Sequence, residues 1–99
     1  HAGLTPAPCR MVGVPRVAEA PAALECRWLQ TIRLATVEGV EMEQFLVLGQ
    51  VMGVHIDDRF IVDGKVDTAA MRPIMRAGYM DYFVATPETK FSIRRPTSA

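Results

Sequence analysis

The sequence predicts a mainly β fold with a short helix, in which this chain builds only part of a sheet. Two long segments, Ala22–Leu34 and Phe45–Ile56, carry the apolar patterns of strands. A proline-rich segment precedes them, and short apolar runs separated by turn residues follow. Two long strands with a few short ones do not close a barrel, and a lone hairpin is marginal in water. We therefore expect the sheet to need a partner surface.

Length and composition allow one small domain and exclude several kinds of partner. Of the 99 residues, 49% are hydrophobic and 22% charged, so a core is possible and the composition is not that of a disordered chain. Eleven basic residues balance eleven acidic ones, which predicts no nucleic acid and no anionic membrane as partner. No apolar run approaches the roughly 20 residues of a membrane helix.

The two cysteines predict a reducing compartment. Cys9 and Cys26 are too few for a disulfide scaffold and lack the spacing of a metal or redox site. Free thiols suit the cytosol, so we expect a cytoplasmic protein. The chain begins at His1 without a methionine, as expected of a cut or truncated polypeptide.

Residues 1–21 are predicted to form a proline-rich extended arm. Proline fixes φ and removes a backbone donor, so this segment cannot run as a long helix or a central strand. The prolines are Pro6, Pro8, Pro15 and Pro21. The expected apolar anchors of the arm are Leu4, Met11, Val12, Val14 and Val17.

The first long strand is expected to present one apolar face. Period-two alternation over Ala22–Leu34 places on one side Leu24, Cys26, Trp28, Ile32 and Leu34. We expect Trp28 to pack in a core. The polar stretch 36–43, which contains Gly39, fits a hairpin connection.

The second long strand is expected to be central. Both faces of Phe45–Ile56 are largely apolar, as in strands that are buried on two sides. Gly49 and Gly53 share one face, where another group can approach the backbone closely.

The remaining third of the chain is expected to alternate turns with short elements. Asp63-Gly64 forms a turn, and a short helix covers roughly Thr68 to Met75, with Pro73 limiting its regularity. Tyr79–Val84 runs extended, and Phe91–Ile93 forms a last strand. Either Asp67 or Thr68 caps the helix.

His55 ends the second long strand and is followed at once by two carboxylates. A strand end is a usual place for a functional side chain on a sheet. The alternative is a histidine tied to Asp57, to Asp58 or to a backbone carbonyl. A metal site with these aspartates is a weaker alternative, because no third cluster of ligands follows.

Together these motifs make the sequence resemble the C-terminal half of the flavin reductase-like proteins. The matching pieces are Ala2-Gly3-Leu4-Thr5-Pro6, Ala23-Leu24-Glu25-Cys26-Arg27, His55-Ile56-Asp57-Asp58, Val66-Asp67, Arg72-Pro73, Phe91 and Arg95-Pro96. That family uses an FMN-binding split β-barrel, and it includes flavoredoxin-type proteins and reductase components of two-component monooxygenases. The resemblance implies that residues 22–99 are half of such a domain. It implies that the N-terminal half, which holds most donors to the FMN phosphate, lies on another chain or was lost.

The resemblance also implies a redox function. The complete unit would be an NAD(P)H-dependent FMN oxidoreductase that passes hydride or electrons between NAD(P)H and flavin, and this chain alone would be inactive. Two non-enzymatic alternatives stay open: a flavin-binding electron carrier, and a split-barrel piece that serves assembly only. We expect a homodimer of the complete unit.

Four residues are implied as flavin contacts. His55 would approach the isoalloxazine and donate a hydrogen bond that favours the reduced, anionic form. Arg76, Tyr79 and Tyr82 surround Gly78, where aromatic rings beside an arginine suit stacking on flavin or nicotinamide, or a dimer interface. Plain packing of the tyrosines is the alternative. Many relatives carry two adjacent glycines where this chain has Gly78-Tyr79.

Overall fold

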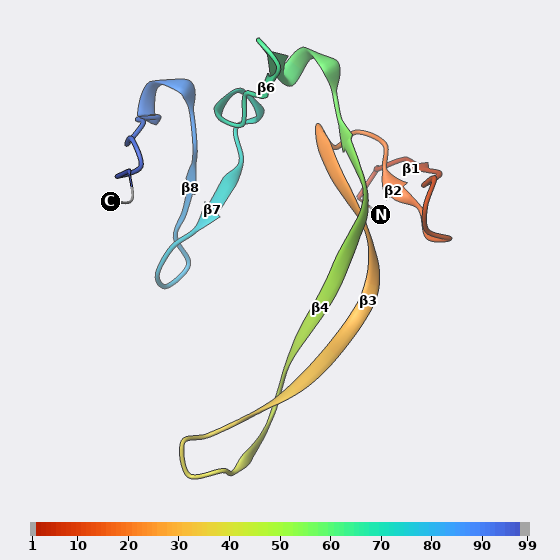
Figure 1. The fold of residues 1–99 in the computed structure, drawn as a ribbon, viewed down its shortest axis with the longest axis vertical. Coiled ribbons are helices and arrows are strands. Elements are labelled where there is room, and N and C mark those ends of the chain that lie inside the picture. Colours follow the sequence, from red (N-terminus) through yellow and green to blue (C-terminus); the bar gives the residue numbers. More distant parts are fainter. Residues whose placement is uncertain (1, 98–99) are drawn as a thin grey trace. The chain divides into compact units, whose positions relative to one another are not determined.

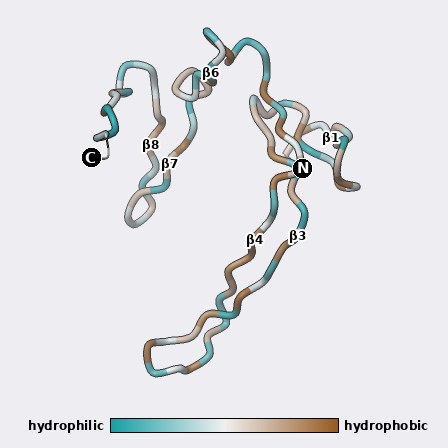
Figure 2. The backbone as a smooth tube through the Cα atoms, in the orientation of Figure 1, coloured by the Kyte–Doolittle hydropathy of each residue, from teal (hydrophilic) through white to brown (hydrophobic). Residues whose placement is uncertain are grey.

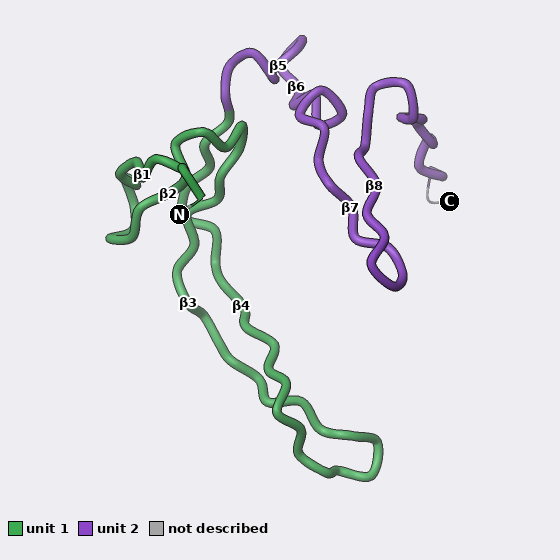
Figure 3. The backbone as a smooth tube through the Cα atoms, turned by 180° about the vertical axis from the view of Figure 1, so that it is seen from behind, with its two compact units in different colours: residues 1–56 green, residues 57–99 purple. Residues whose placement is uncertain are grey.

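The computed structural model describes residues 2–97, so His1 and the last two residues lie outside the description. The chain divides into two compact units, residues 1–56 and residues 57–99 (Figure 3). The predicted arm, residues 1–21, lies inside the first unit, and its boundary stays a prediction.

A long antiparallel hairpin makes up most of the first unit (Figure 1). Its strands are β3 (Ala22–Ala35) and β4 (Glu41–Ile56), which confirms both predicted strands and starts the second at Glu41 rather than Phe45. The turn between them closes with a hydrogen bond of 2.8 Å from the Thr36 amide to the Val40 carbonyl. Gly39 has φ +88° in this turn, a left-handed value that glycine adopts without steric cost.

The register of the hairpin shifts three times. The shifts fall between Glu25 and Cys26, between Trp28 and Gln30, and between Arg33 and Ala35. Leu29 on β3 and Met52 on β4 consequently have no opposite residue in the ladder. An extra residue of this kind changes which side chains share a face. The single apolar face predicted for Ala22–Leu34 is therefore interrupted at Leu29.

Hydrophobic residues recur along both strands of the hairpin (Figure 2). Their side chains form no core among the described residues of this unit. Trp28 is 72% exposed, Val47 62% and Phe45 53%. The Trp28 indole donates to Thr31 Oγ1 at 2.8 Å instead of packing in a core, which corrects the expectation from sequence. A two-stranded ribbon has no second layer to bury these residues.

The arm is irregular for most of its length. Its only regular pieces among the described residues are β1 (Pro6–Ala7) and β2 (Arg16–Val17), which pair antiparallel. A carboxylate fastens its start: the Thr5 amide donates to Glu19 at 2.9 Å and 3.0 Å. Most of the predicted apolar anchors are exposed, with Leu4 at 57% and Val14 at 63%. Hydrogen bonds to carboxylates, rather than apolar packing, hold the arm within this chain.

The second unit is a series of short hairpins and single 3-10 turns. The turn η1 (Asp58–Phe60) leads into β5 (Ile61–Val62) and β6 (Lys65–Val66). Asp63 and Gly64 connect β5 and β6 with φ values of 52° and 73°, which confirms the predicted turn. Two consecutive positive φ values are typical of the tight hairpin turn that Asp-Gly favours.

The predicted helix is reduced to one 3-10 turn. Instead of reaching from Thr68 to Met75, it covers only η2 (Ala69–Met71). Arg72 ends it with φ 54° and is followed by Pro73. The proline ring disfavours a right-handed helical conformation in the residue before it, so the turn cannot continue.

The rest of this unit is a short hairpin and an irregular end. β7 (Ile74–Arg76) pairs antiparallel with β8 (Tyr82–Val84), and η3 (Pro87–Thr89) follows. The predicted strand Phe91–Ile93 is wrong for this structure, because residues 91–93 have no regular structure. Phe91 is 80% exposed and Ile93 81%, so no neighbouring strand pairs with this segment in the described chain. Within residues 2–97, no helix is long and apolar enough to cross a membrane.

Candidate functional site

The most buried charged group among the described residues lies beside the candidate residue His55. Glu25 on β3 is 2% exposed, and it stands opposite Gly53 on β4. His55 follows Gly53 by two residues, so the histidine and the glutamate project from the same face of the hairpin. This face is where the arm returns onto the strands.

The Glu25 carboxylate binds the arm and His55 at the same time. Its Oε1 accepts from the Met11 amide at 2.5 Å, and its Oε2 accepts from the Arg10 amide at 2.9 Å. His55 Nε2 lies in short hydrogen-bond contact with the same Oε2. The Arg10 amide first and the His55 ring second lower the pKa of Glu25 from 4.5 to about 2, against the opposing effect of burial. Glu25 is therefore ionised at neutral pH.

The ionised carboxylate determines which ring nitrogen of His55 carries a hydrogen. A carboxylate accepts hydrogen bonds and cannot donate them, so Nε2–H of His55 must be the donor. Nδ1 has no hydrogen-bond partner among the described residues. It accepts when the ring is neutral and donates when the ring is protonated.

Neither neighbouring aspartate is the partner of His55, which corrects the alternative from sequence. Asp57 instead accepts from the Arg59 amide and from Arg59 Nε, both at 3.1 Å, and so caps η1. Asp58 belongs to the first turn of η1. Their positions after the strand end make them part of the next element, which is why sequence adjacency was misleading.

Gly53 provides the space for this arrangement. A Cβ atom at Gly53 would lie 3.3 Å from Met11 Cγ and 3.4 Å from Glu25 Cδ, which is tighter than ordinary contact. The close approach predicted at this glycine is confirmed, and the approaching groups are the arm and the glutamate. Any larger side chain at position 53 would push one of them away.

A thiol of the arm lies near Glu25, and a guanidinium lies near that thiol. Desolvation, and then the negative charge of Glu25, raise the pKa of the Cys9 thiol, while Arg16 opposes them. Arg16 Nε is buried without a hydrogen-bond partner in the described chain. Both residues come from the arm, so the arm brings a thiol to Glu25 and a guanidinium to that thiol.

The second group of candidate residues lies on the β7–β8 hairpin. Arg76 and Tyr82 are opposite each other in the register. Arg76 Nη1 donates to the Tyr82 hydroxyl at 2.5 Å, and Nη2 donates to the Tyr79 carbonyl at 3.0 Å. The guanidinium also lies 5.1 Å from the centre of the Tyr82 ring. The predicted proximity of Arg76, Tyr79 and Tyr82 is thus present, and His55 belongs to the other unit.

Tyr79 stands in a conformation that normally belongs to glycine. Its φ is 59°, and its side chain is 94% exposed. The Asp81 amide donates to the Gly78 carbonyl at 3.1 Å, and this bond closes the loop. An aromatic ring with no packing partner in its own unit is available for contact with another molecule.

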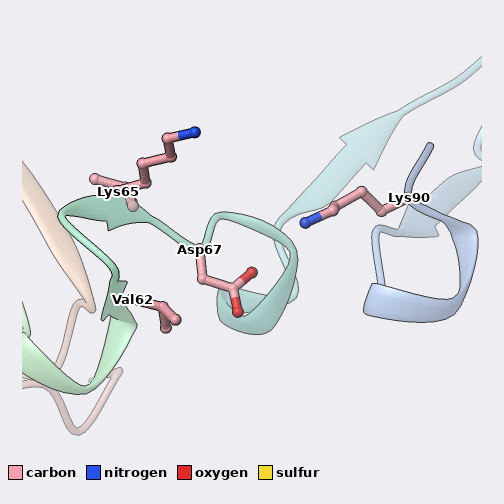
Figure 4. Close-up of a pocket in the computed structure, with 5 residues that line it drawn as sticks. Val62, Lys65, Asp67 and Lys90 are labelled. Carbon is pink, nitrogen blue, oxygen red and sulfur yellow. The ribbon is translucent and has the colours of Figure 1, made fainter. Parts of the chain in front are cut away.

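A shallow hollow in the second unit contains none of the predicted site residues (Figure 4). Its volume is about 240 Å³, and it is lined by Val62, Lys65, Val66, Asp67 and Lys90. Asp67 also accepts from the Ala70 amide at 3.4 Å. Figure 4 shows Lys90 extending toward the segment that carries Asp67, whereas Lys65 points away from it.

Relatives of this chain are about twice as long as the chain itself. An uncharacterized protein of Halalkalibacterium halodurans is 35% identical over 97 residues, which are 98% of this chain and 45% of that protein. An uncharacterized protein of Deinococcus radiodurans is 37% identical over 100 residues, which cover 98% of this chain and 40% of that protein. The chain therefore spans less than half the length of the curated relatives it matches. No family model matches the sequence.

Two solved structures share the fold. Nitrilotriacetate monooxygenase component B from Bacillus cereus superposes with a TM-score of 0.75 at 24% identity, covering 91% of this chain and 44% of that one. The 2-nitrobenzoate 2-nitroreductase of Pseudomonas fluorescens gives 0.73 at 21% identity, covering 98% and 48%. This chain therefore has the fold of about half of each protein.

Sequence reasoning missed Glu25. In the alternation of β3 it reads as one of several polar residues on a solvent-facing side. The pairing of Glu25 with Gly53, which leaves room for the long side chain to fold over the strand, follows from a register that alternation alone does not reveal.

Proposed function

We propose that this chain is the C-terminal half of an FMN-binding flavin reductase-like protein. In this proposal it supports hydride or electron transfer between NAD(P)H and flavin when the N-terminal half is joined to it. The observation that carries the proposal is the fold, which matches 44% of a monooxygenase component and 48% of a nitroreductase while using 91% and 98% of this chain. Both of those names denote redox chemistry.

The two-stranded sheet supports the proposal that this chain is half of a domain. β3 and β4 form a two-stranded sheet whose apolar side chains, such as Trp28 and Val47, are largely exposed. The proposed partner that covers these side chains is the N-terminal half of the split barrel, carried by another polypeptide. A second copy of the complete unit then forms a dimer with the first. Such an obligate contact buries more than roughly 2,000 Å². The proposed compartment is the cytoplasm.

The described residues suit the ring end of FMN. His55 keeps Nδ1 free of partners, and Tyr79 offers an exposed aromatic face on the hairpin tip. The Arg76 guanidinium is held by Tyr82 and the Tyr79 carbonyl, which keeps a positive charge at that tip. The sequence has no glycine-rich phosphate loop, so gripping the phosphate falls to the other half.

The chain's own contribution is electrostatic and positional. When bound, FMN supplies the ring that takes up hydride and passes electrons on. A protonated His55 can donate from Nδ1 to a ring that carries negative charge, and Glu25 balances the imidazolium from the other side. Arg76 and the two tyrosines would orient the ring or the nicotinamide by stacking.

A visible absorption spectrum of the protein with its N-terminal half, followed by anaerobic addition of NADH, tests this proposal. Flavin absorption that bleaches with NADH is the expected result. Absorption without bleaching with either NADH or NADPH favours the electron carrier. A protein that neither contains nor binds FMN would overturn the proposal and leave a fragment that serves assembly.

A further inference from the structure

We propose that Glu25 is a positioning residue that couples the order of the proline-rich arm to the orientation and tautomer of His55. The proposal deepens the function proposed above, because His55 is one of its flavin contacts. It rests on one juxtaposition: a single buried carboxylate is shared by two consecutive arm amides and a histidine ring.

The first step is that both carboxylate oxygens are needed as acceptors. Oε1 serves the Met11 amide, and Oε2 serves the Arg10 amide and His55 together. Every one of these partners is a donor. A side chain with only one acceptor oxygen cannot satisfy all three.

The second step is that the shared oxygen connects two parts distant in sequence. Arg10 is 15 residues from Glu25, and His55 is 30 residues from it. Glu25 is 2% exposed, so water cannot readily replace either partner. If the arm leaves, the carboxylate loses the donors that hold it in place and becomes free to move. The orientation of the His55 ring, which depends on its contact with Oε2, then changes as well.

The contact with Glu25 also determines what the other ring nitrogen of His55, Nδ1, can do. Because Nε2–H points at Glu25, Nδ1 is the atom that His55 can offer to a ligand. Glu25 therefore makes Nδ1 an acceptor in the neutral ring, and protonation turns the same atom into a donor. The Cys9 thiol of the arm also lies near Glu25, and Arg16 lies near that thiol.

The test is nitrogen NMR of the His55 ring together with amide exchange at Arg10 and Met11, in wild type and Glu25→Gln. A glutamine has one acceptor oxygen. If that oxygen takes the place of Oε1, the NH₂ group faces both His55 and the Arg10 amide, and it forces the neutral ring into the Nδ1–H form. If it takes the place of Oε2, the Met11 amide alone loses its acceptor and exchanges about tenfold faster or more.

Glu19→Gln is the matched control. Glu19 also holds an arm amide with both oxygens, that of Thr5, and the described partner of His55 is Glu25 rather than Glu19. One oxygen remains for this single donor in the glutamine variant, so we expect a smaller change in exchange at Thr5 than at Met11 and an unchanged His55 ring. A Glu25→Asp variant, which keeps the charge but shortens the reach, guards against a glutamine variant that does not fold.

The outcomes are distinguishable. Either the tautomer switch, with release of the Arg10 amide, or the release of the Met11 amide in Glu25→Gln supports the proposal. A wild-type ring in the Nδ1–H form, or a folded variant with neither change, overturns it. FMN titration is separate: changes at His55 and the arm with unchanged FMN affinity would keep the coupling and remove only the flavin contact.

Discussion

The two ends of the β3–β4 hairpin differ in what covers them. At the strand ends around the Glu25–Gly53 pair, the arm returns onto one face and buries a charged residue to 2% exposure. Around the Thr31–Val47 pair nothing in the described unit returns, and Val47 is 62% exposed. In this unit, a residue is therefore buried where another segment of the backbone covers it, and not because its side chain is apolar. In the proposed function another polypeptide covers the bare end, whereas polar contacts within this unit already cover the other end.

The largest expected effect is at the bare end. In the protein with its N-terminal half, Val47→Asp should abolish assembly, because the contact would then bury an unpaired charge at a cost of several kcal/mol. Size-exclusion chromatography with light scattering measures this. Val37→Asp is the control, since Val37 is 102% exposed in the turn and should tolerate the charge. A compact, soluble monomer of the unmodified chain would contradict the assumed partner.

The next effect is at the covered end. His55→Ala should weaken FMN binding about tenfold or more, since a hydrogen bond to a charged group is worth roughly 1.5–3 kcal/mol. The phosphate end is held by the other half, so binding should not vanish. FMN titration with a thermal melt of each variant checks this. Asp57→Asn should leave the affinity unchanged because Asp57 binds Arg59, and an equal loss in both variants would count against the pairing seen here.

A smaller effect is expected from filling the space at Gly53. Gly53→Ala should destabilise the fold by about 1 kcal/mol, the lower end for overpacking, because the flexible Met11 side chain can give way. Faster exchange of the Met11 amide should accompany the loss. Gly13→Ala is the control, since nothing lies within 4 Å of a Cβ there. Urea unfolding compares the two, and equal stabilities would mean that the arm does not rest on Gly53.

Acid should release the covered end. The pKa of Glu25 is lowered in the fold from 4.5 to about 2, so its contribution is complete above the unfolded value and is lost as pH falls from about 4.5 to about 2. Amide exchange at Arg10 and Met11, corrected for its intrinsic pH dependence, should accelerate in this window. Glu19 also has a lowered pKa, caused first by the Thr5 amide, so Glu25→Gln is needed to separate the two. If amide exchange at Arg10 and Met11 depended on pH in the same way in the wild type and in Glu25→Gln, Glu25 would not be the group that acid releases.

The smallest effect concerns the tip of the β7–β8 hairpin. Tyr79 at φ 59° costs about 1–2 kcal/mol relative to glycine, and glycine loses roughly 0.5–1 kcal/mol more entropy on folding. Tyr79→Gly should therefore stabilise the protein by about 1.5 kcal/mol at most, while weakening FMN binding if the ring stacks. Thermal unfolding and FMN titration measure the two effects. Gly78→Ala, at a position without positive φ, should show no comparable stabilisation.

The sequence predicted what depends on local pattern. The two strands of the hairpin, the Asp63-Gly64 turn and the irregular arm follow from alternation, turn residues and prolines. The helix over Thr68–Met75 failed because the residue before Pro73 cannot continue it. The strand Phe91–Ile93 failed because a strand exists only with a partner to pair with. Among the site residues, the proximity of Arg76, Tyr79 and Tyr82 follows from a short hairpin.

The pairing of Glu25 with His55 could not be derived in the same way. It depends on the register between β3 and β4, and that register shifts next to Glu25 itself. It also depends on the path of the arm, which the alternation of apolar and polar residues does not predict. The nearest carboxylates in sequence, Asp57 and Asp58, were the natural expectation, but a strand end directs them into the following turn.

The two cysteines give this chain a built-in site for chemical labelling. Cys26 is exposed on β3, whereas Cys9 is half-buried and its pKa is raised by desolvation and by Glu25. Only the thiolate reacts with maleimides and iodoacetamides, so at neutral pH these reagents should modify Cys26 well before Cys9. A fluorophore on Cys26 would report on the hairpin when a second polypeptide docks. A later reaction at Cys9 would report the moment at which the arm lifts away.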